Sequence, residues 1–235
     1  MKLPIRISPQ PIIDAITEFR FDTILHPSAV FGVIYNSLKN DYPAVSELPI
    51  TQLPEVLRDK DESLRYKPHY LITSVKGFKV QIGPKVVTVS SPIEYVGWIV
   101  FENEVLRIIN IMSELKIVKS VKKIGIRYID FFEADIFEKI NLSIEHSALD
   151  LESQSKNFQA VFADDNCKHI IQISNSANYN SMNGSVIDID TILQGDEVRL
   201  EVVKDLLNNL HKKNKKLFFN LLKKEFIDTL NPEYE

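Results

Sequence analysis

The chain has 235 residues, 44% of them hydrophobic and 26% charged, which is the composition of an ordinary globular protein. Its formal net charge of −4 excludes the recruitment of nucleic acid or acidic membrane by overall charge. A single cysteine excludes an internal disulfide bond, and no apolar run is long enough for a leader or a membrane span, so we expect a cytoplasmic protein.

The first half of the chain predicts one short helix among strands. Residues 12–22 alternate apolar and charged side chains, which is typical of a strand with one buried face. A short helix is expected over 28–40, and a proline-containing surface connection over 43–61. Glycine-containing turns then separate three strands of an antiparallel meander, expected at 70–75, 78–82 and 86–90.

A long amphipathic helix is predicted from Ser91 to Leu115. Ser91 and Glu94 have the spacing of a capping box, and Pro92 suits the first helical position. Apolar residues then recur at helical spacing as far as Leu115. Beyond this helix the period changes, and the β-branched and aromatic residues of 121–132 predict a strand.

The second half predicts a similar order of elements. A short helical or irregular piece at 135–140 comes first, and a polar loop is expected at 175–184. A closing helix from about Asp196 to Leu222 carries leucines at a spacing near that of a heptad repeat, which could seat a second helix or pack within the chain. Further strands are expected at 147–151, 158–162, 169–173 and 186–189.

These patterns predict an α+β fold, in which two long helices pack on an antiparallel or mixed β-sheet. We expect residues 1–235 to form a single compact unit. Because each half runs from a strand through a short helix and antiparallel strands to a long helix, we also raise the hypothesis of two similar halves, 11–116 and 117–230.

Three segments carry a resemblance to a known family. They read Pro-Ile-Ile-Asp-Ala-Ile-Thr-Glu-Phe-Arg-Phe at 11–21, Tyr-Val-Gly-Trp at 95–98 and Gly-Ile-Arg-Tyr-Ile-Asp at 125–130. In this order they resemble a sporadically distributed family of uncharacterised prokaryotic proteins of about this length. Gln10 stands where that family often has a proline, and Asp130 replaces its usual Asn. The resemblance implies no activity, but the scattered occurrence of the family implies a mobile or host-defence context.

Four charged residues on two predicted strands form a candidate anion or partner site: Glu18, Arg20, Arg127 and Asp130. Arginine forks bind anionic groups in two parallel hydrogen bonds, which favours a binding role. The alternative is a lattice of salt bridges that fixes the register of the sheet. Arg127 and Asp130 also have opposite parity, so an undistorted strand points them to opposite faces.

Tyr95, Trp98 and Glu102 form a candidate pocket wall on adjacent turns of the predicted long helix. Aromatic side chains of this kind also anchor a helix on a sheet without lining any pocket, and this is the alternative.

The closing helix carries the only basic concentration in the chain. Its candidate nucleic-acid contacts are Lys212, Lys213, Lys215 and Lys216. No aromatic residues alternate with them on an exposed face, so a solvated lysine face is the alternative.

Signatures of metal, cofactor and enzyme chemistry are missing from the sequence. Asp188 and Asp190 share a strand face but have no third ligand, and the five histidines do not have zinc-ligand spacing. No phosphate-binding loop, dinucleotide fingerprint or hydrolase motif occurs. We therefore expect no cofactor and no metal, and lean against an enzyme.

The function predicted from these observations is that of a non-catalytic interaction protein with a protein partner, in which a homodimer is one form. Two alternatives stay open. One is nucleic-acid binding through the basic closing helix, and the other is an enzyme of undetected class built around Arg20, Arg127 and nearby carboxylates.

Overall fold

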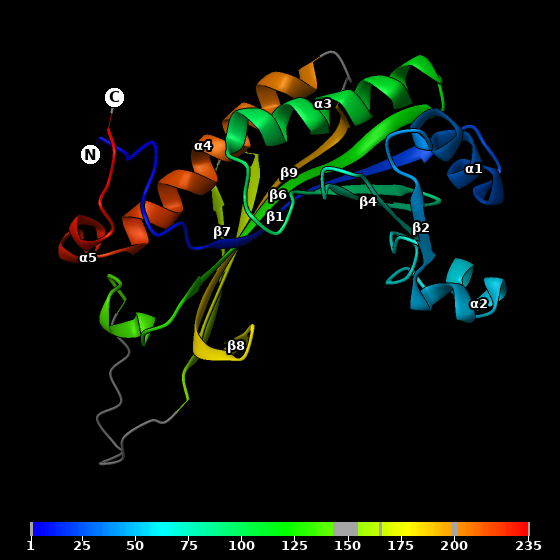
Figure 1. The fold of residues 1–235 in the computed structure, drawn as a ribbon. Coiled ribbons are helices and arrows are strands. Elements are labelled where there is room, and N and C mark those ends of the chain that lie inside the picture. Colours follow the sequence, from blue (N-terminus) through cyan, green and yellow to red (C-terminus); the bar gives the residue numbers. More distant parts are fainter. Residues whose placement is uncertain (1, 143–154, 165, 199–201, 235) are drawn as a thin grey trace.

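The computed structural model describes residues 2–142, 155–164, 166–198 and 202–234, which form a nine-stranded antiparallel sheet with helices (Figure 1). The strand order is β2-β3-β4-β5-β1-β6-β9-β8-β7. The predicted α+β class is confirmed, and the sheet is antiparallel rather than mixed. The strands are β1 (Ile12–Thr23), β2 (Ala44–Glu47), β3 (Tyr70–Thr73), β4 (Lys79–Gly83), β5 (Val86–Ser90), β6 (Val118–Phe132), β7 (Asn157–Asp164), β8 (Cys167–Tyr179) and β9 (Met182–Val198). The helices are α1 (Pro27–Leu38), α2 (Glu55–Lys60), α3 (Trp98–Glu114), α4 (Val203–Leu221) and α5 (Lys224–Thr229), with 3₁₀ turns at η1 (Pro49–Gln52) and η2 (Ile136–Glu138).

The central pair of strands, β1 and β6, shows why the sequence forms a half-covered sheet. On β1 the side chains of Ala15, Thr17, Phe19 and Phe21 are buried, and the residues between them are only half buried. A period of two places these two sets on opposite faces. One face of the sheet, here called the helix face, is therefore covered, and the other, the outer face, carries the charged side chains.

The helix face is covered by α3 and α4, which run over the centre of the sheet in Figure 1. Phe101, Val105 and Ile108 of α3 join one apolar core with the inward residues of β1. Leu207 and Leu210 of α4 belong to the same core, so these leucines pack within the chain and do not present a seam to a second helix. A second core lies between the end of α4, α5 and the far ends of β6, β8 and β9.

The predicted capping box at Ser91 is wrong, because α3 begins at Trp98. Ser91 is buried and its amide donates to the carbonyl of Ala15 at 2.9 Å, so the chain still follows the sheet at this point. The helix starts only after Gly97, whose φ of 84° is the left-handed conformation that glycine adopts without strain. Residues 91–97 are therefore a loop, and this loop becomes part of the site described below.

Three other expectations are corrected. The connection at 43–61 contains β2, η1 and α2. The predicted polar loop at 175–184 is the tip of the β8–β9 hairpin, which turns at Asn180 and Ser181 with positive φ. Its residues are polar because the hairpin projects into solvent, not because they are irregular. The closing helix starts at Val203 because β9 continues to Val198, and the strand predicted at 147–151 lies outside the described residues.

The N-terminal segment pairs with the C-terminal residues and crosses the helix face beside α4. The amide of Ile5 donates to the carbonyl of Glu233 at 2.8 Å, and that of Ser8 donates to Leu230 at 2.7 Å. Figure 1 shows the two ends of the chain close together at this place. Among the helices that the structure describes, none combines the length and apolarity that a membrane span requires.

Candidate functional site

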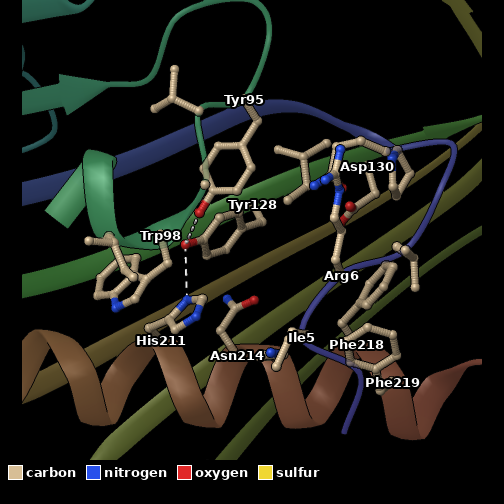
Figure 2. A pocket seen from close by; sticks show the side chains of 18 of the residues that line it. Ile5, Arg6, Tyr95, Trp98, Tyr128, Asp130, His211, Asn214, Phe218 and Phe219 are labelled. Carbon is tan, nitrogen blue, oxygen red and sulfur yellow. Dashed lines mark hydrogen bonds between the residues drawn. The ribbon is translucent and has the colours of Figure 1, made fainter. Parts of the chain in front are cut away.

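A pocket of about 920 Å³ lies between the start of α3 and the middle of α4 (Figure 2). Its floor is β6, and one wall is the loop before α3 with the first turn of that helix. The second wall is α4, and the N-terminal segment closes a third side. Segments far apart in the sequence therefore build the site, and the pairing of the chain ends holds one of its sides.

A chain of hydrogen bonds crosses the pocket from Tyr95 to α4, as the dashed lines in Figure 2 show. The hydroxyls of Tyr95 and Tyr128 lie 3.2 Å apart, and the Tyr128 hydroxyl lies 3.0 Å from Nδ1 of His211. The indole of Trp98 stacks on the imidazole of His211, with the ring centroids 4.1 Å apart. The loop, β6 and α4 are thus joined at one point by their polar and aromatic side chains.

The groups of this hydrogen-bonded chain stay uncharged at neutral pH. Burial, with smaller contributions from Lys215 and Lys212, lowers the pKa of His211 to about 3. Burial also raises the pKa of Tyr95 to about 12 and that of Tyr128 well above its ordinary value. In the tautomer in which Nδ1 accepts from Tyr128, the Tyr128 oxygen is free to accept from Tyr95, and the Nε2 nitrogen carries the imidazole hydrogen.

Asp130 is the acidic residue of the pocket floor. It is 3% exposed and lines the pocket, yet its carboxyl forms no hydrogen bond or ion pair with any described residue. Burial raises its pKa well above the ordinary value, and the negative charge of Asp188 raises it further. Burial of a polar group without a protein partner costs free energy, and this carboxyl is open to a ligand from the pocket above it.

The wall formed by α4 follows from its helical spacing. His211, Asn214 and Phe218 are three and four residues apart, so they share the helix side that faces β6. Asn214, where an apolar residue would be expected, donates from Nδ2 to the carbonyl of Ile189 at 2.8 Å and to Oγ1 of Thr191 at 3.1 Å. Asn214 therefore fixes α4 on the sheet directly beside the pocket.

The four residues of the candidate anion site do not form one site, because the sheet separates Asp130 from the other three. On the outer face, the Nε of Arg20 donates to Glu18 at 2.8 Å, and Lys123 donates to the same Glu18 oxygen at 2.9 Å. Arg127 binds Asp188 of β9 through two hydrogen bonds of 2.8 and 2.5 Å. Asp130 lies on the helix face. The outer-face residues form the salt-bridge lattice of the alternative interpretation.

The candidate pocket wall is divided in another way. Tyr95 and Trp98 line the pocket, whereas Glu102 does not. Glu102 is buried and accepts a hydrogen bond from Nδ2 of Asn208. The other side-chain atom of that amide, Oδ1, accepts from the indole nitrogen of Trp98 at 3.0 Å. Glu102 thus acts behind the wall, because it orients the amide that holds Trp98.

The four lysines of the candidate nucleic-acid contact lie in different surroundings. Lys213 forms an ion pair with Asp164 at 2.8 Å, and Lys215 lines the pocket. Lys212 and Lys216 are exposed. These lysines do not form one open basic face.

Sequence reasoning missed the pocket itself and the roles of His211, Asn214 and the N-terminal segment. The helical spacing of His211 and Asn214 is visible in the sequence, but nothing local indicates that residues 5–12 lie beside α4. No cluster of three or more possible metal ligands occurs among the described residues.

Comparison with known proteins gives no match, either to a protein-family model or to a curated protein. The resemblance to the sporadically distributed prokaryotic family stays a prediction.

Proposed function

We propose that the protein is a non-catalytic binding protein that holds a small molecule in the pocket between α3 and α4. The observation that carries this proposal is the Asp130 carboxyl, which is buried and unpartnered at the floor of the pocket. A ligand that binds this carboxyl would offset the free energy that its burial costs. The volume of about 920 Å³ and the aromatic walls suit a small-molecule site.

Binding is favoured over catalysis by the ionisation of the groups around the pocket. General acid–base catalysis works best when the pKa of the catalytic group lies near the working pH. The pKa values of His211 and Tyr95 lie far from neutrality, at about 3 and about 12. The enzyme alternative therefore rests on Asp130 alone, and turnover of a bound compound that Asp130→Asn abolishes would support it.

A thermal-shift screen of small molecules tests the proposal when it includes a variant with a blocked pocket. Val100→Trp places an indole at the pocket mouth, and Ile24→Trp adds the same side chain at an exposed position away from the pocket. A ligand at a hundred times its Kd stabilises a protein by about 2.7 kcal/mol. We expect hits that raise the Tm of the wild type and of Ile24→Trp but not of Val100→Trp. Equal shifts in all three proteins would contradict the proposal.

We further propose that the halves 11–116 and 117–230 descend from one duplicated unit. The strand order supports this: β5, β4 and β3 follow outward from β1 just as β9, β8 and β7 follow outward from β6. The helices α3 and α4 come after β5 and β9, respectively. Superposition of the two halves tests the idea, and unrelated paths of α3 and α4 over their strands would contradict it.

A protein partner is a second proposal, supported by the edge strand β7, and we propose that this partner is a second copy of the chain. Val161 and Phe162 are 56% and 50% exposed, and an exposed apolar edge strand readily pairs with another strand. Antiparallel pairing with a copy would bring Lys156, before the strand, near Asp164 at its end. Light scattering should show a dimer that Val161→Lys converts to a monomer, and a monomeric wild type would contradict the proposal.

A further inference from the structure

The pocket changes in polarity from its floor to its mouth. Asp130, 3% exposed, lies at the floor with Tyr128, and Asn214, 2% exposed, lies beside them on the α4 wall. At the mouth, Ile99 is 72% exposed, Ile5 53% and Val100 50%. Apolar side chains from two separate segments thus surround the entrance to a polar floor.

We propose that the ligand is an amphipathic amine, whose ammonium group binds Asp130 and whose hydrocarbon part covers the apolar mouth. This inference rests on the proposed function and adds the chemical class of the ligand.

An ammonium group suits the floor because it supplies what Asp130 lacks. The charged group that acts on Asp130 from behind the sheet is Asp188, which is also negative, so the field at this carboxyl favours a cation. Tyr95 and Tyr128 stand beside it, and aromatic ring faces attract cations. A hydroxyl group can form a hydrogen bond with the protonated carboxyl, but only a cation compensates the charge of the ionised carboxylate.

Two cations of the protein also line the pocket, Arg6 and Lys215. Arg6 is exposed, and the pKa of Asp130 responds to burial and to Asp188 but to no cation among the described residues. The positive charge at the floor is therefore left for the ligand to supply.

A hydrocarbon part suits the mouth because the exposed residues there gain from leaving water. Burial of a methylene group contributes about 0.8 kcal/mol, which corresponds to as much as fourfold in Kd for each added carbon. Phe218 and Phe219 extend the apolar surface inward along α4. Ile99 and Val100 are exposed, so their substitution tests this contact with little cost to the fold.

Amine binding is coupled to a proton at Asp130. The raised pKa favours the protonated carboxyl in the free protein, and an ammonium group at hydrogen-bond distance favours the carboxylate. Three other titratable groups that face the pocket, Tyr95, Tyr128 and His211, stay neutral at neutral pH because burial shifts their pKa values away from it. We therefore expect proton release on binding wherever Asp130 is protonated before the ligand enters.

Isothermal titration with octylamine, 1-octanol and octanoic acid tests the proposal on the full chain. We expect octylamine to bind at least tenfold more tightly than either of the other two ligands. Hexylamine should bind more weakly than octylamine, because its shorter chain covers less of the mouth. Asp130→Asn should remove the preference for the amine. The matched control is Asp190→Asn, which removes a carboxyl with raised pKa from the outer face and should leave the preference intact.

The outcomes separate this inference from the proposed function. Equal binding of octylamine and octanol, or an amine preference that survives in Asp130→Asn, would overturn the amine while the pocket remains a binding site. A failure of octylamine to bind the wild type would overturn it as well. The proposed function fails only in the screen with Val100→Trp. Ile99→Ser should weaken octylamine more than butylamine, and an equal effect on both would overturn the role of the mouth.

Discussion

The charged side chains on the outer face of the central strands are paired, whereas the titratable groups on the helix face are neutral or unpaired. On the outer face, Arg20 and Lys123 both bind Glu18, and Arg127 binds Asp188. On the helix face, the tyrosines and His211 stay neutral, and Asp130 has no partner among the described residues. Arg127 and Asp130 are three residues apart on β6, so one strand serves both arrangements.

The difference separates a face whose charges are paired within the chain from a face whose carboxyl is open to a ligand. Paired charges on half-buried positions fix the register of β1, β6 and β9 and need nothing from outside the chain. An unpartnered carboxyl in a pocket weakens the free protein, and a ligand can recover that stability. Removing a charged group should therefore lower the free energy of unfolding on the outer face and raise it on the helix face.

The largest expected effect is the loss of folding stability that His211 causes as the pH falls. Because its folded pKa of about 3 lies below the ordinary 6.5, the folded state binds fewer protons than the unfolded chain between these values. The stability that His211 contributes is complete above pH 6.5 and falls by about 1.4 kcal/mol per pH unit below it. The ring resonances of His211 in NMR should not titrate between pH 8 and 4. His211→Gln identifies these resonances, and a midpoint near 6.5 would contradict the neutral pocket.

On the outer face, Arg127→Ala should destabilise the protein by about 2 kcal/mol. It leaves Asp188 buried without its partner, but the guanidinium is 41% exposed, so the cost is below that of a fully buried pair. Chemical denaturation measures the free energy of unfolding. Adding Asp188→Asn to Arg127→Ala should regain part of the loss, and a further loss in the double variant would show that the pair does not act as a unit.

On the helix face, Asp130→Asn should instead stabilise the free protein, by roughly 1–2 kcal/mol at neutral pH. Because the folded pKa of Asp130 is raised, the folded state binds more protons than the unfolded chain, and wild-type stability falls as the pH rises through that pKa. The advantage of Asp130→Asn should vanish about one pH unit below the ordinary Asp pKa of about 3.9, where both states are protonated. A variant less stable than the wild type at pH 7 would show that Asp130 is structural.

The smallest effect is expected from lysines that belong to neither arrangement. Lys212→Ala combined with Lys216→Ala should change the free energy of unfolding by less than about 0.5 kcal/mol, because both side chains are exposed. Lys213→Ala is the comparison, since it removes the ion pair with Asp164 and should cost more. The double variant also tests nucleic-acid binding, which predicts a loss of salt-dependent affinity.

Local patterns predict the elements of this fold well and their limits less well. Strands β1, β5 and β6 follow from alternation and β-branched composition, which act over a few residues. The start of α3 does not, because the capping pattern at Ser91 is local while the burial of Ser91 against β1 depends on the sheet. Strand order is likewise a long-range property, and the sequence pointed to it only through the similar order of elements in the two halves.

The site is predicted only in fragments, for the same reason. Tyr95 and Trp98 line the pocket, but Tyr95 precedes α3 and Trp98 is its first residue, whereas both were expected inside a helix. Asp130 is named as a candidate but is grouped with residues of the opposite face. Its spacing of three residues from Arg127 already predicts that the two side chains point to opposite faces of the strand. The position of the N-terminal segment beside α4 has no signal in its own composition, so no local rule could place it.

The pairing of β1 with β6 also determines when the centre of the sheet can form while the chain is being synthesised on the ribosome. About 95 residues separate the end of β1 from the start of β6, and β1 needs β6 along one of its edges. At roughly 5–20 residues per second, that edge stays open for about 5–20 s after β1 emerges. During this interval β5 can occupy only the other edge. The nascent chain therefore exposes the middle of its final sheet, and this is the period in which a chaperone would be most useful to it.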